Sequence, residues 1–202
     1  MGLYLTSFLC GATIMVLEIL GFRLLPPYFG ASISVWGSLL GVVMVALAVG
    51  YYAGGFLADR MPYPRMLYLM VLVAAGYNLL VLVAYRDILE FAMRFDLVTG
   101  SLAASLLLFA VPMATLGTVS PFIIRLLARD GAVGTVAGHV YAVSTVGSLA
   151  GTFLASFYLI PTIGIRASLT LSLVTLTVVA GLGLLGSGLR ARRRGKLNPT
   201  PP

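Results

Sequence analysis

Long runs of apolar residues, separated by short polar stretches, dominate this chain. A run of about 20 apolar residues is long enough to cross the hydrocarbon core of a membrane as an α-helix. We expect each of the runs to form one transmembrane helix. They cover residues 3–25, 35–58, 66–85, 97–121 or beyond, 136–160 and 167–189. The pattern predicts an all-α fold, a polytopic membrane bundle of about six transmembrane helices over residues 1–189.

The connections between the runs are short, so we expect no soluble domain in this sequence. The mixed segment 86–96 predicts a short interfacial helix, because apolar residues alternate with charges there. Pro112 predicts a kink in the fourth run, and Pro161 is expected to end the fifth. Residues 190–202 form a basic, proline-containing tail. The first run has no basic residue before Glu18, so we interpret it as a membrane helix rather than a signal peptide.

Composition and charge agree with a membrane location. The chain is 60% hydrophobic and only 9% charged, with a mean hydropathy of +1.05, whereas soluble domains carry charge on roughly 25% of their residues. Nine of the 13 Lys and Arg residues fall in the second and fourth connections and in the tail. Because basic residues accumulate on the cytoplasmic side, we expect a multi-pass cell-membrane protein with both termini in the cytoplasm. The basic tail is expected to lie near anionic headgroups.

Several kinds of chemistry are excluded by the residue types present. His139 and Cys10 are each the single residue of their kind, so we expect neither a multi-histidine metal site nor an internal disulfide. The glycines of residues 181–186 fit a G-x-G-x-x-G pattern, but they end an apolar run and follow no strand, so we interpret them as packing glycines. We expect no cofactor and no nucleic-acid partner.

Glycines recur at four-residue spacing, which puts small residues on one helix face and lets helix backbones approach closely. The spacing predicts tight packing of the second and fifth helices in particular. The pairs are Gly37 and Gly41, Gly50 and Gly54, Gly134 and Gly138, and Gly147 and Gly151. Of these we expect Gly50, Gly54, Gly147 and Gly151 to lie at helix–helix contacts.

Glu18 is the most informative polar residue, because a carboxylate inside a membrane helix is costly and usually faces protein or a water-filled cavity. Helical spacing places Gly11 and Gly21 on its face, which indicates packing against another helix. Glu18 and Asn78 lie about 22 Å and 18 Å from the cytoplasmic ends of their runs, so they could meet inside the bundle. They would form a site for a proton or an amine-bearing ligand, or a structural polar contact. Arg23 points away from Glu18 and is expected to snorkel to the outer interface.

Residues 55–60 (Gly-Phe-Leu-Ala-Asp-Arg) resemble the motif between helices two and three of the major facilitator superfamily. We expect Gly55 to allow a close helix contact. Asp59 is expected to cap a neighbouring helix or to pair with an arginine, which would latch the cytoplasmic side. Arg60 and Arg65 supply the basic residues of the motif, and an ordinary charged loop is the alternative interpretation.

The likeness extends along the chain, through Glu18, Arg23, Phe29 and Gly30, and through residues 55–60, 141–151 and 159–166. These positions resemble the membrane part of the fused major-facilitator/spermidine synthase proteins, over nearly all six helices. The resemblance implies a half-major-facilitator-like module joined to a cytoplasmic aminopropyltransferase domain. That domain transfers an aminopropyl group from decarboxylated S-adenosylmethionine to a diamine.

This sequence departs from that family because it has no room for the Rossmann-like catalytic domain and lacks its acidic residues. We therefore expect no enzymatic activity from this chain alone. The resemblance implies a non-catalytic membrane module that works with an aminopropyltransferase domain or partner, in polyamine delivery or transport. The alternatives are a half-size major-facilitator-like transporter that acts as a homodimer, and a structural membrane anchor.

Overall fold

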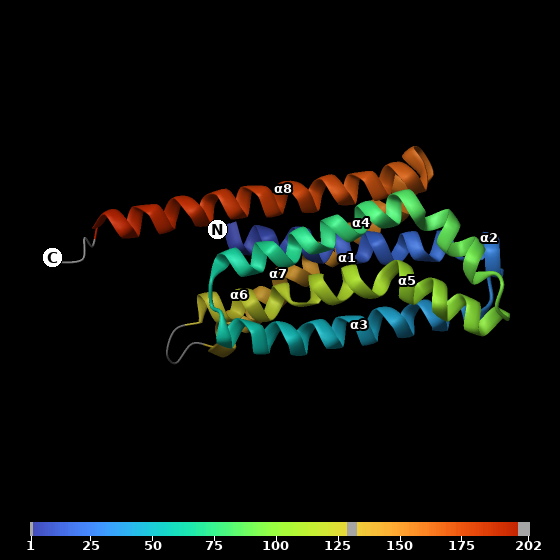
Figure 1. The fold of residues 1–202 in the computed structure, drawn as a ribbon, viewed down its shortest axis with the longest axis horizontal. Helices are drawn as coiled ribbons and strands as arrows, with labels where there is room; N and C mark the ends of the chain where they lie inside the picture. Colours follow the sequence, from blue (N-terminus) through green and yellow to red (C-terminus); the bar gives the residue numbers. More distant parts are fainter. Residues whose placement is uncertain (1, 129–132, 198–202) are drawn as a thin grey trace.

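The structure, a computed structural model, describes residues 2–128 and 133–197, with side chains up to residue 188. Every regular element in these ranges is a helix, and the start of the first and the end of the last lie at the same end of the bundle (Figure 1). The elements are α1 Gly2–Leu24, α2 Pro26–Phe29, α3 Ile33–Arg60, α4 Pro64–Ala92, α5 Leu97–Gly117, α6 Val119–Leu127, α7 Val133–Phe153, the π-helix η1 Leu154–Leu159, and α8 Ile160–Leu197.

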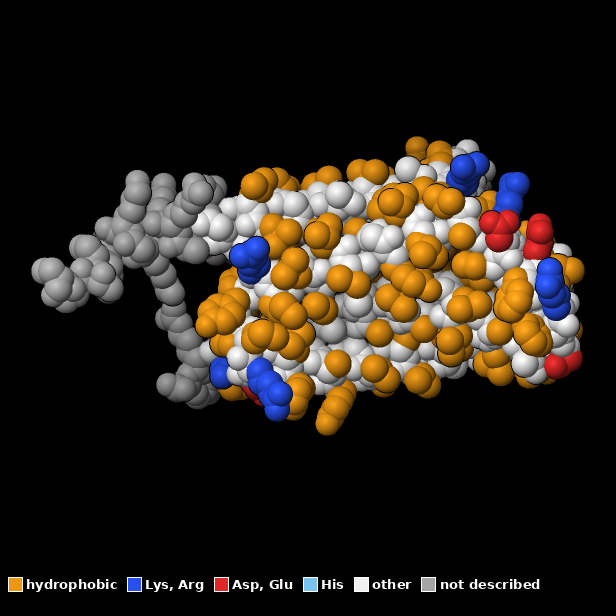
Figure 2. Space-filling view, in the orientation of Figure 1, with side chains coloured by type: hydrophobic (Ala, Val, Ile, Leu, Met, Phe, Trp, Pro, Cys, Tyr) orange, Lys and Arg blue, Asp and Glu red, His pale blue; other side chains and the backbone are white. Residues whose placement is uncertain are grey.

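Within the described ranges, five segments are long and apolar enough to cross a membrane. The sequence predicted about six, and the difference lies in the last segment, which contains both the fifth and the sixth predicted helix. The segments are Gly2–Phe29, Ile33–Arg60, Pro64–Ala92, Leu97–Leu127 and Val133–Gly188. Hydrophobic side chains cover the length of the bundle on the face shown in Figure 2, and charged side chains lie near its two ends. This distribution is the one that a bilayer requires.

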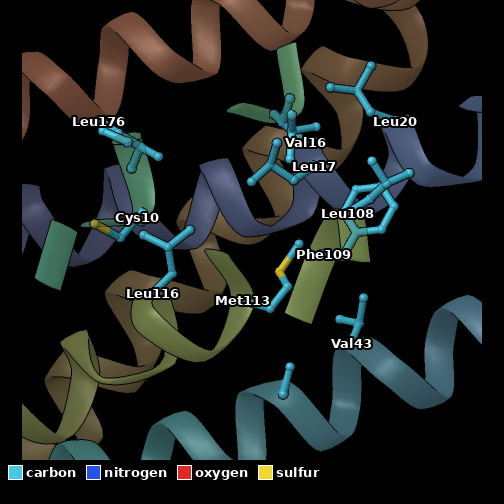
Figure 3. Packing of buried hydrophobic residues seen from close by; sticks show 14 of the residues in the cluster. Cys10, Val16, Leu17, Leu20, Val43, Leu108, Phe109, Met113, Leu116 and Leu176 are labelled. Atoms are coloured by element: carbon cyan, nitrogen blue, oxygen red, sulfur yellow. The ribbon is translucent and has the colours of Figure 1, made fainter. Parts of the chain in front are cut away.

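The helices pack in three main pairs, α1 with α7, α3 with α5, and α4 with α8. The hydrophobic core draws on every helix, and one part of it lies between α1, α3 and α5. There the side chains of Leu17, Phe109 and Met113 are at most 2% exposed, and Figure 3 shows them together with Val43. Each of these side chains therefore keeps dense van der Waals contact on all sides, which is the main attraction between helices in a membrane.

Two of the four glycine pairs lie in close helix contacts. A Cβ atom added at Gly147 or Gly151 of α7 would meet the backbone carbonyl of Phe8 or Ala12 of α1. These contacts run in the same order along both helices, so α1 and α7 are parallel. Ser7 also donates a hydrogen bond to the Val140 carbonyl, at 3.3 Å. Glycine and serine together bring the two backbones into direct contact.

The second contact of this kind joins α3 to α5. A Cβ atom at Gly50 would meet the Ala114 carbonyl, and one at Gly54 would lie 2.6 Å from the Thr118 Cα. By contrast, Cβ atoms at Gly37, Gly41, Gly134 and Gly138 would have no described atom within 4 Å. The four glycines predicted to lie at helix contacts, Gly50, Gly54, Gly147 and Gly151, therefore all do so. The other two pairs share the four-residue spacing without the contact, because spacing defines a helix face but not what that face meets.

The predicted interfacial helix at 86–96 is wrong. Instead, α4 continues without a break to Ala92, and Figure 1 shows its last part crossing the end of the bundle. Leu89 and Ala92 are fully buried, so the helical repeat of buried positions extends past the charged residues. A Cβ atom at Gly100 of α5 would lie 2.6 Å from the Ala92 carbonyl, which shows how closely α5 begins against the end of α4.

The interruptions of the remaining segments differ from those predicted. Pro112 lies inside α5, and the helix breaks later, at Thr118, so that Pro121 falls in the first turn of α6, where proline is tolerated. The fifth predicted helix passes Pro161 and ends at Gly164, whose φ of 78° and ψ of 178° are not helical. A proline ring displaces the carbonyl four residues earlier, and the wider turns of η1 accommodate this displacement.

The boundary predicted between membrane domain and tail at residue 189 also shifts, because α8 continues to Leu197. The side chains of the basic residues from Arg190 onward and the whole of residues 198–202 lie outside the described part of the chain. The expectation that this tail meets anionic headgroups stays a prediction.

Candidate functional site

Glu18 lies on α1 and is half-buried. Its predicted face does pack against neighbouring helices, since a Cβ atom at Gly11 would lie 2.5 Å from the Ser144 carbonyl of α7. One at Gly21 would lie 2.8 Å from the Leu39 side chain of α3. Among the residues that the structure describes, no hydrogen bond or ion pair reaches the Glu18 carboxylate. The carboxylate therefore has no polar partner among the described residues.

Asn78 of α4 is only 1% exposed, and neither its amide nitrogen nor its amide oxygen has a hydrogen-bond partner. The predicted meeting with Glu18 is not formed as a hydrogen bond. Near one end, Thr6 Oγ1 of α1 lies 3.5 Å from the Tyr68 hydroxyl of α4, so Thr6 and Tyr68 lie at a similar depth. From there Glu18 lies about 18 Å along α1 and Asn78 about 15 Å along α4. The two residues share a depth in the bundle without being joined.

Sequence reasoning missed a second buried polar group without a partner, the hydroxyl of Ser105 on α5. Its neighbour one turn earlier, Ser101, donates to the Ser38 hydroxyl of α3 at 3.0 Å. The available signal was the spacing of Ser101 and Ser105 within an apolar run, which puts both hydroxyls on one helix face. An unpaired buried polar group costs about 1–3 kcal/mol. Two buried side chains, those of Asn78 and Ser105, thus have polar atoms without a partner in the described residues.

The motif at residues 55–60 is partly as predicted. Arg125 Nε donates to Asp59 Oδ1 at 2.8 Å, so Asp59 pairs with an arginine and does not cap a helix. Gly55 has no described atom within 4 Å of an added Cβ, and its neighbour Gly54 makes the close contact instead. The guanidinium of Arg60 lies 4.1 Å from the centre of the Phe56 ring. The ion pair of Asp59 with Arg125 connects α3 to α6 at this end of the bundle.

Arg65 is exposed at the start of α4 and, in the described part of the chain, forms no ion pair. The four motif residues named from the sequence therefore have separate environments. Only Asp59 is connected to another helix by its charge, and its partner Arg125 is distant in sequence.

Removing the Asp59 charge is expected to have a small effect. The Asp59 side chain is 73% exposed and that of its partner Arg125 is 51% exposed. Ion pairs between exposed side chains stabilise a fold by about 0.2–1 kcal/mol before screening by salt. Asp59→Asn should lower the melting temperature in detergent slightly at low salt and not at high salt. Arg65→Gln, which removes a charge without an ion pair, is the control and should show no salt-dependent difference. A large, salt-independent loss for Asp59→Asn would contradict the ion-pair explanation.

Over the residues that the structure describes, the fold and the site define a class of protein, an all-α bundle with five apolar segments of membrane-spanning length. Comparisons with models of protein families, with curated proteins and with solved structures found no match. The function therefore has to be argued from the residues of this chain.

Proposed function

We propose that this chain is a non-catalytic membrane module that holds or passes an amine-bearing molecule and works with a cytoplasmic aminopropyltransferase domain or partner. The observation that carries the proposal is Glu18, a half-buried carboxylate without a described polar partner among packed, apolar helices. A carboxylate in such a place is costly unless a cation or proton neutralises it. A protonated amine supplies that charge, and polyamines are the substrates of the enzymes that the resemblance implies.

The proposed module has six membrane crossings. The last apolar segment, Val133–Gly188, has 56 residues, and a straight helix of that length would measure about 84 Å, against a hydrocarbon core of about 30 Å. The chain leaves helical geometry at Gly164, and the two parts pack on different neighbours, α7 on α1 and α8 on α4. Two crossings fit this segment. The accumulation of Lys and Arg in the second and fourth connections and in the tail favours both termini on the cytoplasmic side.

Labelling of single cysteines is the test of this topology. With Arg94→Cys, a membrane-impermeant maleimide should react from outside intact cells, and with Arg65→Cys it should react only after permeabilisation. The natural Cys10 is 1% exposed and should contribute little background, which a variant without any introduced cysteine will measure. The reverse pattern of access would refute the proposed orientation.

Glu18→Gln is the test of the amine proposal, because it keeps the shape and removes the charge. We expect at least a tenfold weaker binding of radiolabelled putrescine or spermidine to the purified chain, with an unchanged melting temperature. Asp87→Asn is the matched control, since it removes a carboxylate that is exposed near one end of the bundle. If Glu18→Gln binds both amines as well as the parent protein, the amine role of Glu18 is wrong.

One observation favours a second candidate, a half-size transporter that acts as a homodimer. Only Val140, Gly147 and Gly151 of α7 are buried, and its other face exposes large apolar side chains such as Leu149 and Phe153. A second copy could cover this face and complete a pathway. Amine flux in proteoliposomes by the purified chain alone supports the transporter, whereas co-purification of an aminopropyltransferase without such flux supports the first proposal.

A further inference from the structure

A cleft with several charged lining residues lies at the end of the bundle formed by α2 and the last turns of α1 and α4, which we call the α2 end. Its volume is about 330 Å³, and four elements contribute to it. Leu24, which is 3% exposed, forms an apolar floor. The other lining residues are Arg23, Pro27, Tyr28, Tyr85, Arg86, Glu90 and Ile165. The cleft thus combines two guanidinium groups, two phenols and one carboxylate with an apolar base.

Neither arginine of the cleft forms an ion pair within 4.0 Å with a described carboxylate. In the part of the chain that the structure describes, the ion pair within 4.0 Å is that of Arg125 with Asp59, at the opposite end. Arg86 Nε donates to the Tyr85 hydroxyl at 3.1 Å. This bond orients the guanidinium and leaves its terminal N–H groups available. A tetrahedral oxyanion such as a phosphate is a strong acceptor for such groups.

An apolar hollow adjoins the cleft and shares Arg23 and Pro27 with it. Its volume is about 560 Å³, and apart from Arg23 its lining is apolar or aromatic, with Phe22, Pro26, Ala31 and Trp36. The rings of Phe22 and Trp36 meet edge to face, with centroids 6.2 Å apart. Tryptophan side chains of this kind are enriched where a membrane meets water. A charged cleft beside an apolar hollow matches a molecule with a polar head and a hydrocarbon tail.

We propose that the cleft and the hollow together bind one phospholipid with an amine-bearing headgroup. Its phosphate lies between Arg23 and Arg86, its ammonium lies beside Glu90, and the start of an acyl chain follows the hollow lined by Trp36. The carboxylate of Glu90 selects for a zwitterionic headgroup over one that carries a net negative charge. This site is separate from Glu18 and does not depend on the function proposed for it.

Native mass spectrometry of the full chain in detergent, with added dihexanoyl phosphatidylethanolamine, tests the site. We expect one tightly held lipid on the parent protein and at least tenfold lower occupancy with Arg23→Gln or Arg86→Gln. Arg94→Gln is the matched control, because Arg94 is exposed near the same end, lies over the Phe91 ring and does not line the cleft. It should leave occupancy unchanged, and so should Glu18→Gln.

Two further probes separate the sources of a phosphate group. Dihexanoyl phosphatidylglycerol should bind more weakly than the ethanolamine lipid to the parent protein, and Glu90→Gln should remove this preference. Inorganic phosphate should not displace the lipid at equal concentration. Equal occupancy in Arg23→Gln, Arg86→Gln and Arg94→Gln would overturn the proposal, and displacement by inorganic phosphate would show instead a site for a soluble anion.

Discussion

Gly147→Leu is expected to cause a large loss of stability, because its side chain would have to occupy the space of the Phe8 carbonyl of α1. That atom belongs to a helix backbone and cannot move aside as a flexible side chain can. Overpacking of this kind costs about 1–3 kcal/mol or more, so the melting temperature in detergent should fall by several degrees or the folded protein should not be recovered. Gly151→Leu, which faces the Ala12 carbonyl, should behave in the same way.

The control for this result lies on the same helix. Gly138→Leu makes the same chemical change at a position with no described atom within 4 Å of an added Cβ. Its melting temperature should stay close to that of the parent, since a new apolar side chain is acceptable on an exposed face of a membrane helix. If Gly138→Leu and Gly147→Leu lose stability equally, the effect comes from glycine replacement in general and not from the α1–α7 contact.

Gly164→Ala is expected to have the second large effect. With φ at 78° and ψ at 178°, Gly164 has a backbone conformation that is essentially restricted to glycine and costs other residues about 1–3 kcal/mol. An added Cβ there would meet no described atom within 4 Å, so the penalty is one of conformation and not of space. We expect a lower melting temperature and easier proteolysis between residues 153 and 168.

Gly181→Ala serves as its control, because Gly181 is helical and also has no described atom within 4 Å of an added Cβ. Alanine favours a helix over glycine by roughly 0.5–1 kcal/mol, so this variant should be as stable as the parent or slightly more. If Gly164→Ala leaves the melting temperature unchanged, the chain can reverse direction at this position in another backbone conformation.

The helical architecture could be predicted from the sequence because only helices satisfy the backbone inside a long apolar run. The ends of the helices were harder to predict. The charges of residues 86–96 suggested a separate interfacial element, yet Leu89 and Ala92 continue the buried face of α4. The exposed Glu90 directly follows the buried Leu89, because successive residues differ by 100° around the axis.

The candidate site was less predictable for a related reason. Helix periodicity correctly put Gly11 and Gly21 on a packed face beside Glu18, but it does not tell which helix lies opposite. Asn78 could therefore be expected at the right depth and still lack a bond to Glu18. Likewise, Gly54 packs against the end of α5, whereas an added Cβ at the next residue, Gly55, would have no described atom within 4 Å, and the motif does not distinguish the two. The ion pair of Asp59 with Arg125 joins two helices that are distant in sequence, so spacing along the chain does not reveal it.

The parallel contact between α1 and α7 also has a consequence for biosynthesis. Phe8 leaves the ribosome before its partner Gly147, which is made 139 residues later. At about 5–20 residues per second, the first helix waits roughly 7–28 s in the membrane before its partner exists. During this interval the face of α1 that carries Gly11 is without α7. A nascent chain stalled before residue 147 should therefore expose this face to crosslinking by insertion factors, and a longer chain should shield it.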